Sequence, residues 1–426
     1  MSVGSDPAAT SARFRAALAQ HADTFAKHPI GLSVSGGGDS IALMHLAVKA
    51  LGPQAFRAIT INHGLRPEAV DEIALVAKQA QALGVPHTVV QWTWDGTGNL
   101  QAAARNGRWA AIREWAFAYN IRSVWLGHTE DDQLETVLMR LARGSGIDGL
   151  MAMAQVTQRD ELTLMRPLLG IARSDLRTWL KAERIAWADD PSNDDPRFDR
   201  VRARQMFGKL EELGLTRKRL LQTVDHMQAA HMSLQIAARQ FARAHVQQDA
   251  GDLIFSQPAL DLEKEDAPRR VMAAAFGWVG SKTYRPRFEQ LLEVVGKARK
   301  GLTVTLGGCI MSPESDGRVR LTREAAATVD VIRSNHPLTD AMGVFWDTRW
   351  FLEGPLGPDL CFRALGEGIR HCPDWRTSGT PRTSLLASPS VWRGDSLIAA
   401  PLAGLSSGWS ARIVADFHSV AFAIED

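Results

Sequence analysis

Six consecutive residues, Ser35-Gly36-Gly37-Gly38-Asp39-Ser40, constrain the fold of this chain more than any other stretch. They follow a short apolar segment, residues 30–34, which predicts a buried parallel strand. Apolar residues then recur at helical spacing from Ile41 until Gly52-Pro53, so a helix is expected after the glycines. The sequence therefore predicts a strand, a glycine loop and a helix in direct succession.

This loop has the properties of a phosphate site. Three consecutive glycines let the backbone turn tightly and bring its N–H groups against an anion, and the helix N-terminus adds partial positive charge. No lysine follows the last glycine, so the loop does not match the type that transfers a γ-phosphate. A loop that holds the β- and γ-phosphates as a leaving group favours attack at the α-phosphate, with Asp39 placed to hold Mg²⁺. The alternative is a glycine-rich turn without a ligand.

Polar clusters follow two later strands in the same way. Residues 56–61, 87–92 and 123–126 predict strands that alternate with helices, which indicates an α/β fold with a doubly wound parallel sheet. Ligands of such sheets sit beyond the carboxyl ends of the strands. The clusters at residues 63–66 and 127–136 fall at those ends, so we expect a single active site there.

The cluster after the fourth strand contains His128, Asp132 and Glu135, which can share one helical face if the helix begins early. Two carboxylates beside a phosphate loop can hold Mg²⁺ or bind a substrate ammonium group. Glu130 and Asp131 fit instead a solvated acidic first turn, which the helix dipole favours.

A proline-rich acidic loop at residues 189–196 precedes Arg200, Arg202 and Arg204. Guanidinium groups suit phosphate oxygens because they can bind them bidentately. The alternative for these arginines is a solvated helix face.

Composition excludes several classes of protein. The three cysteines, Cys309, Cys361 and Cys372, form no Cys-x-x-Cys pair, which argues against a disulfide framework or zinc site and favours a cytoplasmic location. No run of eighteen or more apolar residues occurs, so no membrane span is expected, and the polar N-terminus lacks the charged-then-apolar profile of a signal peptide. The net charge of +2 is too small to indicate a nucleic-acid partner by itself.

The length of 426 residues predicts two or three domains. We expect an N-terminal nucleotide-binding domain at residues 1–207 and a mainly helical domain at residues 208–325. A small mixed α+β domain, with short β-like runs between glycines and prolines, is expected at residues 331–426.

Four motifs together resemble one family, the tRNA(Ile)-lysidine synthetases of the PP-loop ATP pyrophosphatase group. They are the glycine loop, His63-Gly64-Leu65-Arg66, the block from Gly127-His128 through Asp131-Asp132 and Glu135-Thr136 to Arg143-Gly144-Ser145-Gly146, and Asp190-Pro191-Ser192-Asn193 with the arginines after it. The loop alone would indicate only the wider group, and the combination is what makes the resemblance specific.

The resemblance implies that lysine is attached to the wobble cytidine of the tRNA(Ile) that bears a CAU anticodon. The cytidine 2-carbonyl oxygen attacks the α-phosphate of ATP, pyrophosphate leaves, and the lysine ε-amine then displaces AMP to form lysidine. Decoding changes from AUG to AUA. The implied cofactors are ATP and Mg²⁺, and the implied partners are this tRNA and L-lysine, with a homodimer left open.

Site residues carry over position by position. Ser35 to Ser40 would bind ATP, Asp39 would hold Mg²⁺, and His128, Asp132 and Glu135 would serve chemistry and lysine binding. The residues that would contact tRNA are Arg66, Arg105, Arg108, Arg200, Arg202 and Arg204. The helical and C-terminal domains would also contact tRNA, although the lysine-rich stretch expected near the C-terminus is not evident.

Two positions depart from the family pattern. Trp109 stands after Arg105 and Arg108 where the family has tyrosine, and Val201 stands between Arg200 and Arg202 where the family has a polar residue. A hydrogen bond from either position is therefore in doubt, while the arginine contacts remain available.

Other classes of protein remain as alternatives. A tRNA thiolation enzyme of the same group would use cysteines near the loop, and the first 308 residues contain none. A nucleotide-binding regulatory protein would not explain His128, Asp132 and Glu135 or the two further domains. Another PP-loop ATP pyrophosphatase, one that modifies tRNA or forms amides, is the remaining enzymatic alternative.

The substitution Asp39→Ala is expected to abolish adenylation while tRNA binding survives, because the carboxylate holds the metal and not the RNA. Pyrophosphate release and tRNA binding by the purified variant measure the two effects. A similar loss of tRNA binding would count against the metal role.

Overall fold

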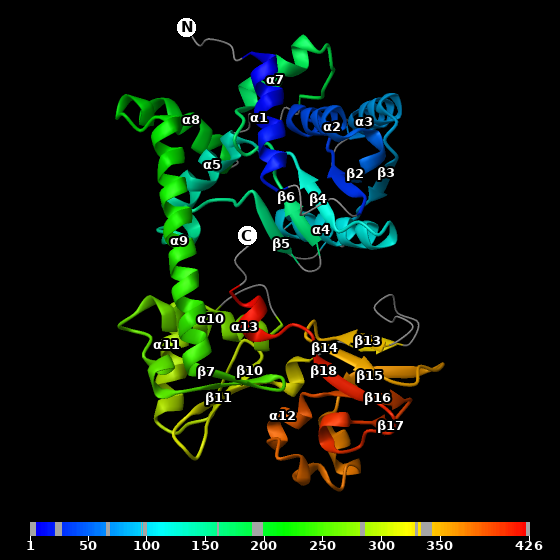
Figure 1. The fold of residues 1–426 in the computed structure, drawn as a ribbon, viewed down its shortest axis with the longest axis vertical. Coiled ribbons are helices and arrows are strands. Elements are labelled where there is room, and N and C mark those ends of the chain that lie inside the picture. Colours follow the sequence, from blue (N-terminus) through cyan, green and yellow to red (C-terminus); the bar gives the residue numbers. More distant parts are fainter. Residues whose placement is uncertain are drawn as a thin grey trace. The chain divides into compact units, whose positions relative to one another are not determined.

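The computed structural model describes residues 6–21, 28–64, 69–94, 96, 100–159, 162–189, 199–281, 286–328, 331–333 and 343–422. These residues form two compact units, residues 1–231 and residues 232–424, and the long helix α9 (Arg217–His245) contributes to both. Figure 1 shows the fold and labels most of its helices and strands, which are numbered in chain order. None of the described helices combines the length and apolar character that crossing a membrane requires.

The first unit is built on a six-stranded sheet with the spatial order β3-β2-β1-β4-β6-β5. Five of the strands run parallel, and β5 pairs antiparallel with β6 at one edge. The strands are β1 (Ile30–Ser33), β2 (Phe56–Asn62), β3 (His87–Gln91), β4 (Ser123–Leu126), β5 (Val156–Arg159) and β6 (Leu162–Met165). The predicted parallel sheet is confirmed. The sequence prediction missed β5 and β6, whose four residues each are too few for a periodic pattern to stand out.

Helices cover both faces of this sheet. Figure 1 shows α2 and α3 on one side and α4 on the other. The helices of the first unit before α9 are α1 (Pro7–Ala19), α2 (Gly38–Leu51), α3 (Ala69–Leu83), α4 (Leu100–Ala118), α5 (Glu130–Leu141), α6 (Ile147–Leu150), α7 (Arg173–Ala182) and α8 (Asp199–Glu212). The doubly wound arrangement predicted from the alternation of strands and helices is thereby confirmed.

The two faces of the sheet belong to separate cores. Trp125 packs with residues of α1, α2 and α7, whereas its neighbour Val124 packs with residues of α4, because successive side chains of a strand point to opposite faces. Gly31 in the central strand admits Trp115 of α4, since a β-carbon at this position would lie 2.8 Å from the indole ring. The central strand β1 is therefore covered on both faces, as expected for a buried parallel strand.

The second unit contains three antiparallel sheets, with strand orders β7-β8-β11-β10-β9, β12-β15-β16-β17 and β13-β14-β18. Its helices are α10 (Asp266–Val279), α11 (Phe288–Arg299), α12 (Arg382–Leu386) and α13 (Phe417–Val420). Its strands are β7 (Val246–Asp249), β8 (Asp252–Phe255), β9 (Val304–Leu306), β10 (Cys309–Pro313), β11 (Val319–Arg323), β12 (Ile332–Arg333), β13 (Gly343–Trp346), β14 (Trp350–Glu353), β15 (Leu360–Ala364), β16 (Pro389–Arg393), β17 (Ser396–Ala399) and β18 (Ser410–Ile413). Helices α10 and α11 lie within residues 208–325, where the sequence predicts helices.

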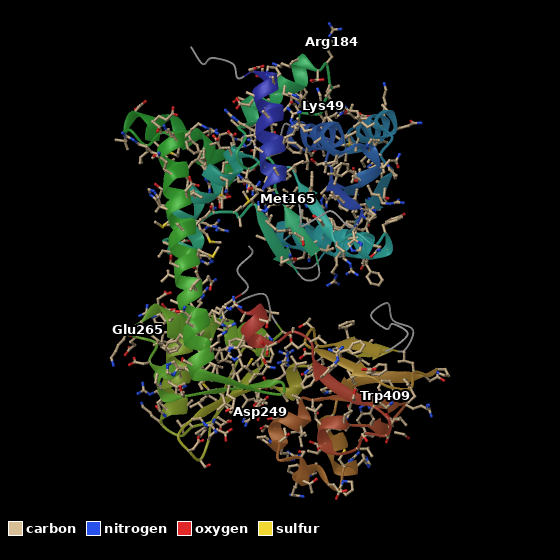
Figure 2. All side chains as sticks on the ribbon, viewed as in Figure 1. Lys49, Met165, Arg184, Asp249, Glu265 and Trp409 are labelled. Carbon is tan, nitrogen blue, oxygen red and sulfur yellow. The ribbon has the colours of Figure 1, made fainter. Side chains whose placement is uncertain are left out.

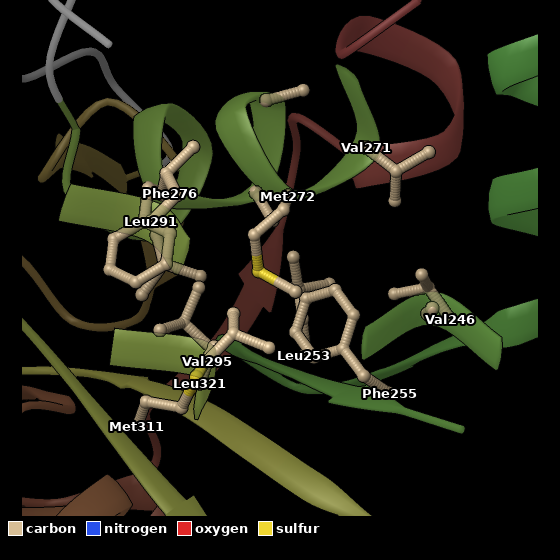
Figure 3. Packing of buried hydrophobic residues seen from close by; sticks show 14 of the residues in the cluster. Val246, Leu253, Phe255, Val271, Met272, Phe276, Leu291, Val295, Met311 and Leu321 are labelled. Atoms are coloured by element: carbon tan, nitrogen blue, oxygen red, sulfur yellow. The ribbon is translucent and has the colours of Figure 1, made fainter. Parts of the chain in front are cut away.

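The main core of this unit lies between its five-stranded sheet and helices α10 and α11. Figure 3 shows Met272 and Phe276 of α10 above Leu253 of β8 and Leu321 of β11. Phe417 of α13, fully buried, joins this core from the C-terminal end of the chain and meets Trp278 edge to face, with ring centroids 5.8 Å apart. The last described helix is thus part of the core that begins near residue 238.

A second core fills the C-terminal sheets. Trp409, labelled in Figure 2, is buried and meets Phe362 edge to face with ring centroids 5.5 Å apart. Between the two cores lies a buried ion pair of Asp347 with Arg349 at 2.9 Å, and Arg349 also donates to the Gly251 carbonyl oxygen. These contacts hold β13 and β14 against the turn between β7 and β8. The three-domain division at residues 207 and 331 stays a prediction.

The substitution Phe417→Ala is expected to destabilise the core under α10 by about 3–5 kcal/mol, because it leaves a cavity among fully buried side chains. Hydrogen exchange of the α10 amides during mild urea denaturation of the full chain measures the change. Phe345, which is 38% exposed, offers the control, and Phe345→Ala should cost no more than about 1 kcal/mol. Equal effects of the two substitutions would contradict the role given to Phe417.

Candidate active site

The glycine loop joins β1 to α2, as predicted, and its conformation is fixed from within. Ser40 accepts a hydrogen bond from the Ser35 N–H at 3.1 Å and donates to the Gly37 carbonyl oxygen at 2.9 Å. Gly36 adopts a φ of 98°, which side-chain-bearing residues rarely tolerate. The first N–H groups of α2 lie at the helix end that carries partial positive charge. This end of the sheet therefore offers backbone donors to an anion.

Neighbouring segments pack directly on the loop. A β-carbon at Gly127, after β4, would lie 3.1 Å from the main chain of Ser40, and one at Gly38 would lie 3.3 Å from Trp187. Ala188 donates its N–H to the Gly36 carbonyl oxygen at 3.0 Å. The glycines thus serve close packing as well as backbone freedom, and residues 187–188 form one wall of the loop.

Three carboxylates converge beside this loop on a single guanidinium group. Arg173, the first residue of α7, places Nε 2.8 Å from Asp39 Oδ2, Nη2 3.5 Å from Asp132 Oδ1 and Nη1 3.6 Å from Glu135 Oε1. Burial raises the pKa of the Asp39 carboxyl above its ordinary value, and the Arg173 ion pair opposes that shift. The structure brings the predicted residues Asp39, Asp132 and Glu135 together.

The helix α5 positions the two later carboxylates. Thr129 precedes the helix, and both its N–H and its hydroxyl donate to Asp132 Oδ2 at 2.8 Å, which fixes that side chain. Glu135, one turn further on, is 2% exposed and accepts from Arg204 at 2.8 Å. One oxygen of Asp132 is therefore used by the helix end, and the other faces the cluster.

His128 lies outside this helix, because α5 begins at Glu130 after the Thr129 cap. The expectation that His128, Asp132 and Glu135 share one helical face is wrong for the histidine. Its Nδ1 is buried and has no hydrogen-bond partner among the described residues. Burial lowers the pKa of His128 to about 4, with nearby Arg166, Arg200 and Arg108 acting in the same direction and Asp132 opposing. The imidazole is therefore neutral near pH 7.

Glu130 and Asp131 are not simply solvated, which corrects the prediction made for them. Arg217 of α9 binds both, at 3.1 Å from Glu130 Oε1 and 3.1 Å from Asp131 Oδ1. Asp131 Oδ2 also accepts the Arg173 N–H at 2.7 Å. Burial acts to raise the pKa of Asp131, but these hydrogen bonds outweigh it and leave the pKa below its ordinary value. Both residues attach neighbouring helices to α5.

The predicted arginines divide into those near the cluster and those elsewhere. Arg204 binds Glu135, and Arg200 lies 3.8 Å from Asp132 Oδ1. Arg202 instead pairs with Asp199 on the surface of α8. Arg105 and Arg108 lie on α4, and Arg108 is close enough to the cluster to lower the pKa of His128. Arg66 and the stretch 190–198 lie outside the described residues.

A cavity of about 190 Å³ opens beyond the carboxyl ends of β1 and β2. Its lining includes Ser35 of the glycine loop, His63 after β2, Glu72 of α3 and Arg108 of α4. It lies at the position where parallel sheets of this kind bind ligands. A larger and more open cavity of about 530 Å³ lies in the second unit, lined by residues such as Trp409, and contains none of the predicted site residues.

The sequence prediction missed Arg173 and part of the lining of the cavity, such as Glu72, whereas it singled out Ser35, His63 and Arg108 of that lining. A signal for Arg173 existed, because a cation in the first turn of a helix opposes the helix dipole and calls for compensating anions nearby. Those anions come from residues 39, 132 and 135, which no local pattern around residue 173 reveals.

A family model described as a PP-loop domain matches residues 10–211. The fold, the loop and this match define the class, and the chain carries a PP-loop domain. The tRNA(Ile)-lysidine synthase of Ruegeria pomeroyi is 43% identical over 392 residues, which cover 90% of this chain and 91% of that protein. Those of Anaplasma marginale and Hyphomonas neptunium are 30% and 34% identical, over 76% and 70% of this chain and 70% and 82% of theirs. The chain belongs to the tRNA(Ile)-lysidine synthase family.

The substitution His128→Gln is expected to flatten the pH dependence of stability between pH 7 and pH 5. Because folding lowers the pKa of His128 from 6.5 to about 4, its contribution is complete above pH 6.5 and is lost as the pH falls toward 4. In the unsubstituted protein, this effect lowers the free energy of unfolding by about 2 kcal/mol at pH 5 relative to pH 7. Urea unfolding of both proteins at the two pH values measures it, and an equal loss in the variant would contradict the assignment.

Proposed function

We propose that this chain forms lysidine in tRNA(Ile) in an ATP-dependent reaction. The observation that carries the proposal is the meeting of the PP-loop with Asp39, Asp132 and Glu135 at one edge of the sheet, in a chain of the lysidine synthase family. The loop can bind an anion, and the carboxylates can bind a cation. The reaction needs one reactant of each kind: ATP is the anion, and the ammonium group of lysine is the cation.

ATP occupies the loop and the cavity beside it in this proposal. The backbone donors of the Ser35–Ser40 loop bind the β- and γ-phosphates, which leave together as pyrophosphate. The nucleoside lies in the cavity lined by His63 and Arg108. Attack by the wobble cytidine 2-carbonyl oxygen on the α-phosphate gives an adenylated base.

Mg²⁺ fits the residues present through Asp39. No group of three or more His, Cys, Asp or Glu side chains capable of holding a metal occurs among the described residues. Magnesium commonly uses only one or two carboxylates together with substrate phosphates and water, and Asp39 lies in the phosphate loop itself. The ion, when bound, would neutralise charge on the phosphates.

Lysine binds through Asp132 and Glu135. Their carboxylates hold the lysine ε-ammonium group next to the adenylated base, and one of them accepts the proton that this group must lose. The resulting neutral amine then attacks C2 of the cytidine, the C2–O bond breaks and AMP leaves. Neutral His128, whose buried Nδ1 has no partner among the described residues, is available to hydrogen-bond the base or the attacking amine. With a pKa of about 4 it is a weak proton acceptor, so its role is in orientation rather than in proton removal.

The tRNA is bound by arginines of both units. Arg66, Arg105, Arg108, Arg200, Arg202 and Arg204 serve the anticodon end in this proposal. In the C-terminal part, Arg363 stacks on Trp392 at 4.1 Å and Arg376 on Trp375 at 4.5 Å, a pairing of guanidinium and aromatic ring suited to unpaired nucleotides. The tRNA specified is the one with a CAU anticodon, the compartment is the cytoplasm, and a homodimer is compatible with this scheme.

Pyrophosphate and AMP should be released from α-labelled ATP only when unmodified tRNA(Ile) with a CAU anticodon is present, and lysine should enter the RNA. The reason is that the base itself is the nucleophile toward the α-phosphate, so that without it the nucleotide has no acceptor. The assay uses the purified chain and omits tRNA, lysine and ATP in turn. Turnover without this tRNA, or none with it, would favour another PP-loop substrate.

A further inference from the structure

Arg173 occupies the centre of the carboxylate cluster that the proposed reaction needs for its cationic reactants. Each of its three nitrogens faces a different carboxylate, those of Asp39, Asp132 and Glu135. The Arg173 side chain is 20% exposed, and those of Asp132 and Glu135 are 9% and 2% exposed. Ion pairs at this level of burial are weakly screened by salt and interact strongly.

The charges within the cluster balance one another. Arg204 binds Glu135 at 2.8 Å, and Arg200 lies 3.8 Å from Asp132. The three carboxylates therefore face three guanidinium groups. A substrate ammonium group that approached Asp132 and Glu135 would meet no net negative charge, and it would have to displace an arginine.

A hydrogen bond holds the main chain of Arg173 beside the cluster. Its N–H donates to Asp131, which Arg217 of α9 holds in turn. The guanidinium group reaches from this anchor to Asp39, which belongs to the glycine loop. Triphosphate bound at that loop would bring several negative charges to the same place, and guanidinium groups bind phosphate oxygens well.

We propose that Arg173 makes lysine binding depend on prior nucleotide binding. This inference rests on the proposed function. Without nucleotide, Arg173 neutralises the carboxylates that receive lysine. When the nucleotide binds, the Arg173 side chain turns from the carboxylates to the phosphates, and Asp132 and Glu135 become available to the ammonium group. Arg173 is thus a positioning residue that orders the two substrates.

Linkage makes the proposal quantitative. If nucleotide raises the affinity for lysine by some factor, lysine must raise the affinity for nucleotide by the same factor. Couplings of this kind are typically about 5- to 150-fold. We therefore expect lysine to bind the unsubstituted protein at least ~10-fold more tightly when α,β-methylene-ATP and Mg²⁺ are present. This analogue cannot be cleaved between its α- and β-phosphorus atoms, and no tRNA is added, so no chemistry intervenes.

The test is calorimetric titration of L-lysine into the full chain, with and without that analogue, for the unsubstituted protein and for Arg173→Gln. In the variant, lysine should bind more tightly than in the unsubstituted protein when nucleotide is absent, and the ratio of affinities should fall to about 1. Structural damage alone would weaken lysine binding, so a gain of affinity identifies the proposed role. Arg173→Lys keeps the positive charge but lacks the three guanidinium nitrogens that face the three carboxylates, so it should give an intermediate ratio.

Arg177→Gln is the matched control. Arg177 lies one turn further along α7, is half exposed and pairs with Asp189 outside the cluster. In Arg177→Gln, the ratio of the lysine affinities with and without the nucleotide analogue should equal that of the unsubstituted protein. Circular dichroism and the melting temperature of each variant report whether it folds, and Arg173→Lys keeps the test open should Arg173→Gln fail to fold.

Two results would overturn the inference. One is a lysine affinity in the unsubstituted protein that does not change with nucleotide. The other is a coupling ratio that persists in Arg173→Gln. If the chain forms lysidine in the tRNA assay but shows either result, only the role of Arg173 is refuted. If neither the unsubstituted protein nor any of its variants binds lysine under any condition, the proposed function fails and this inference fails with it.

Discussion

The position of β1 between β2 and β4 is the constraint on which the site depends. Parallel pairing of the three strands brings their carboxyl ends to one edge, so the glycine loop after β1, His63 after β2 and His128 after β4 lie near one another. Gly127 then allows the segment after β4 to approach the main chain of Ser40. A phosphate loop and a cluster of carboxylates, far apart in the chain, become neighbours because the sheet has this order.

Charge balance determines what is assembled at that edge. Carboxylates as buried as Glu135 are not stable as isolated anions, and arginines from α7 and α8 provide the opposite charge. The same requirement links α5 to α9, where Arg217 binds Glu130 and Asp131. The carboxylate cluster therefore contains its own cations, and the inferred order of substrate binding follows from that requirement.

In the second unit, sheets from distant parts of the chain depend on shared buried contacts. Its C-terminal sheets and its five-stranded sheet are joined by Phe417 in a shared core and by the buried pair of Asp347 and Arg349. The Arg349 side chain also reaches the Gly251 carbonyl oxygen between β7 and β8. Residues 232–424, which form one compact unit, are thus held together by their hydrophobic cores and by buried polar contacts.

The sequence by itself determined strands β1 to β4 of the parallel sheet, the glycine loop and the family, because strong local patterns and motifs identify them. It also identified Asp39, Asp132 and Glu135 as one group, since the ends of parallel strands must meet. Only the tertiary structure decided that Arg173 lies at their centre, that Thr129 uses one oxygen of Asp132, and that His128 is buried and neutral. Those properties depend on contacts between distant segments and on the exclusion of water, and neither produces a periodic pattern in the sequence.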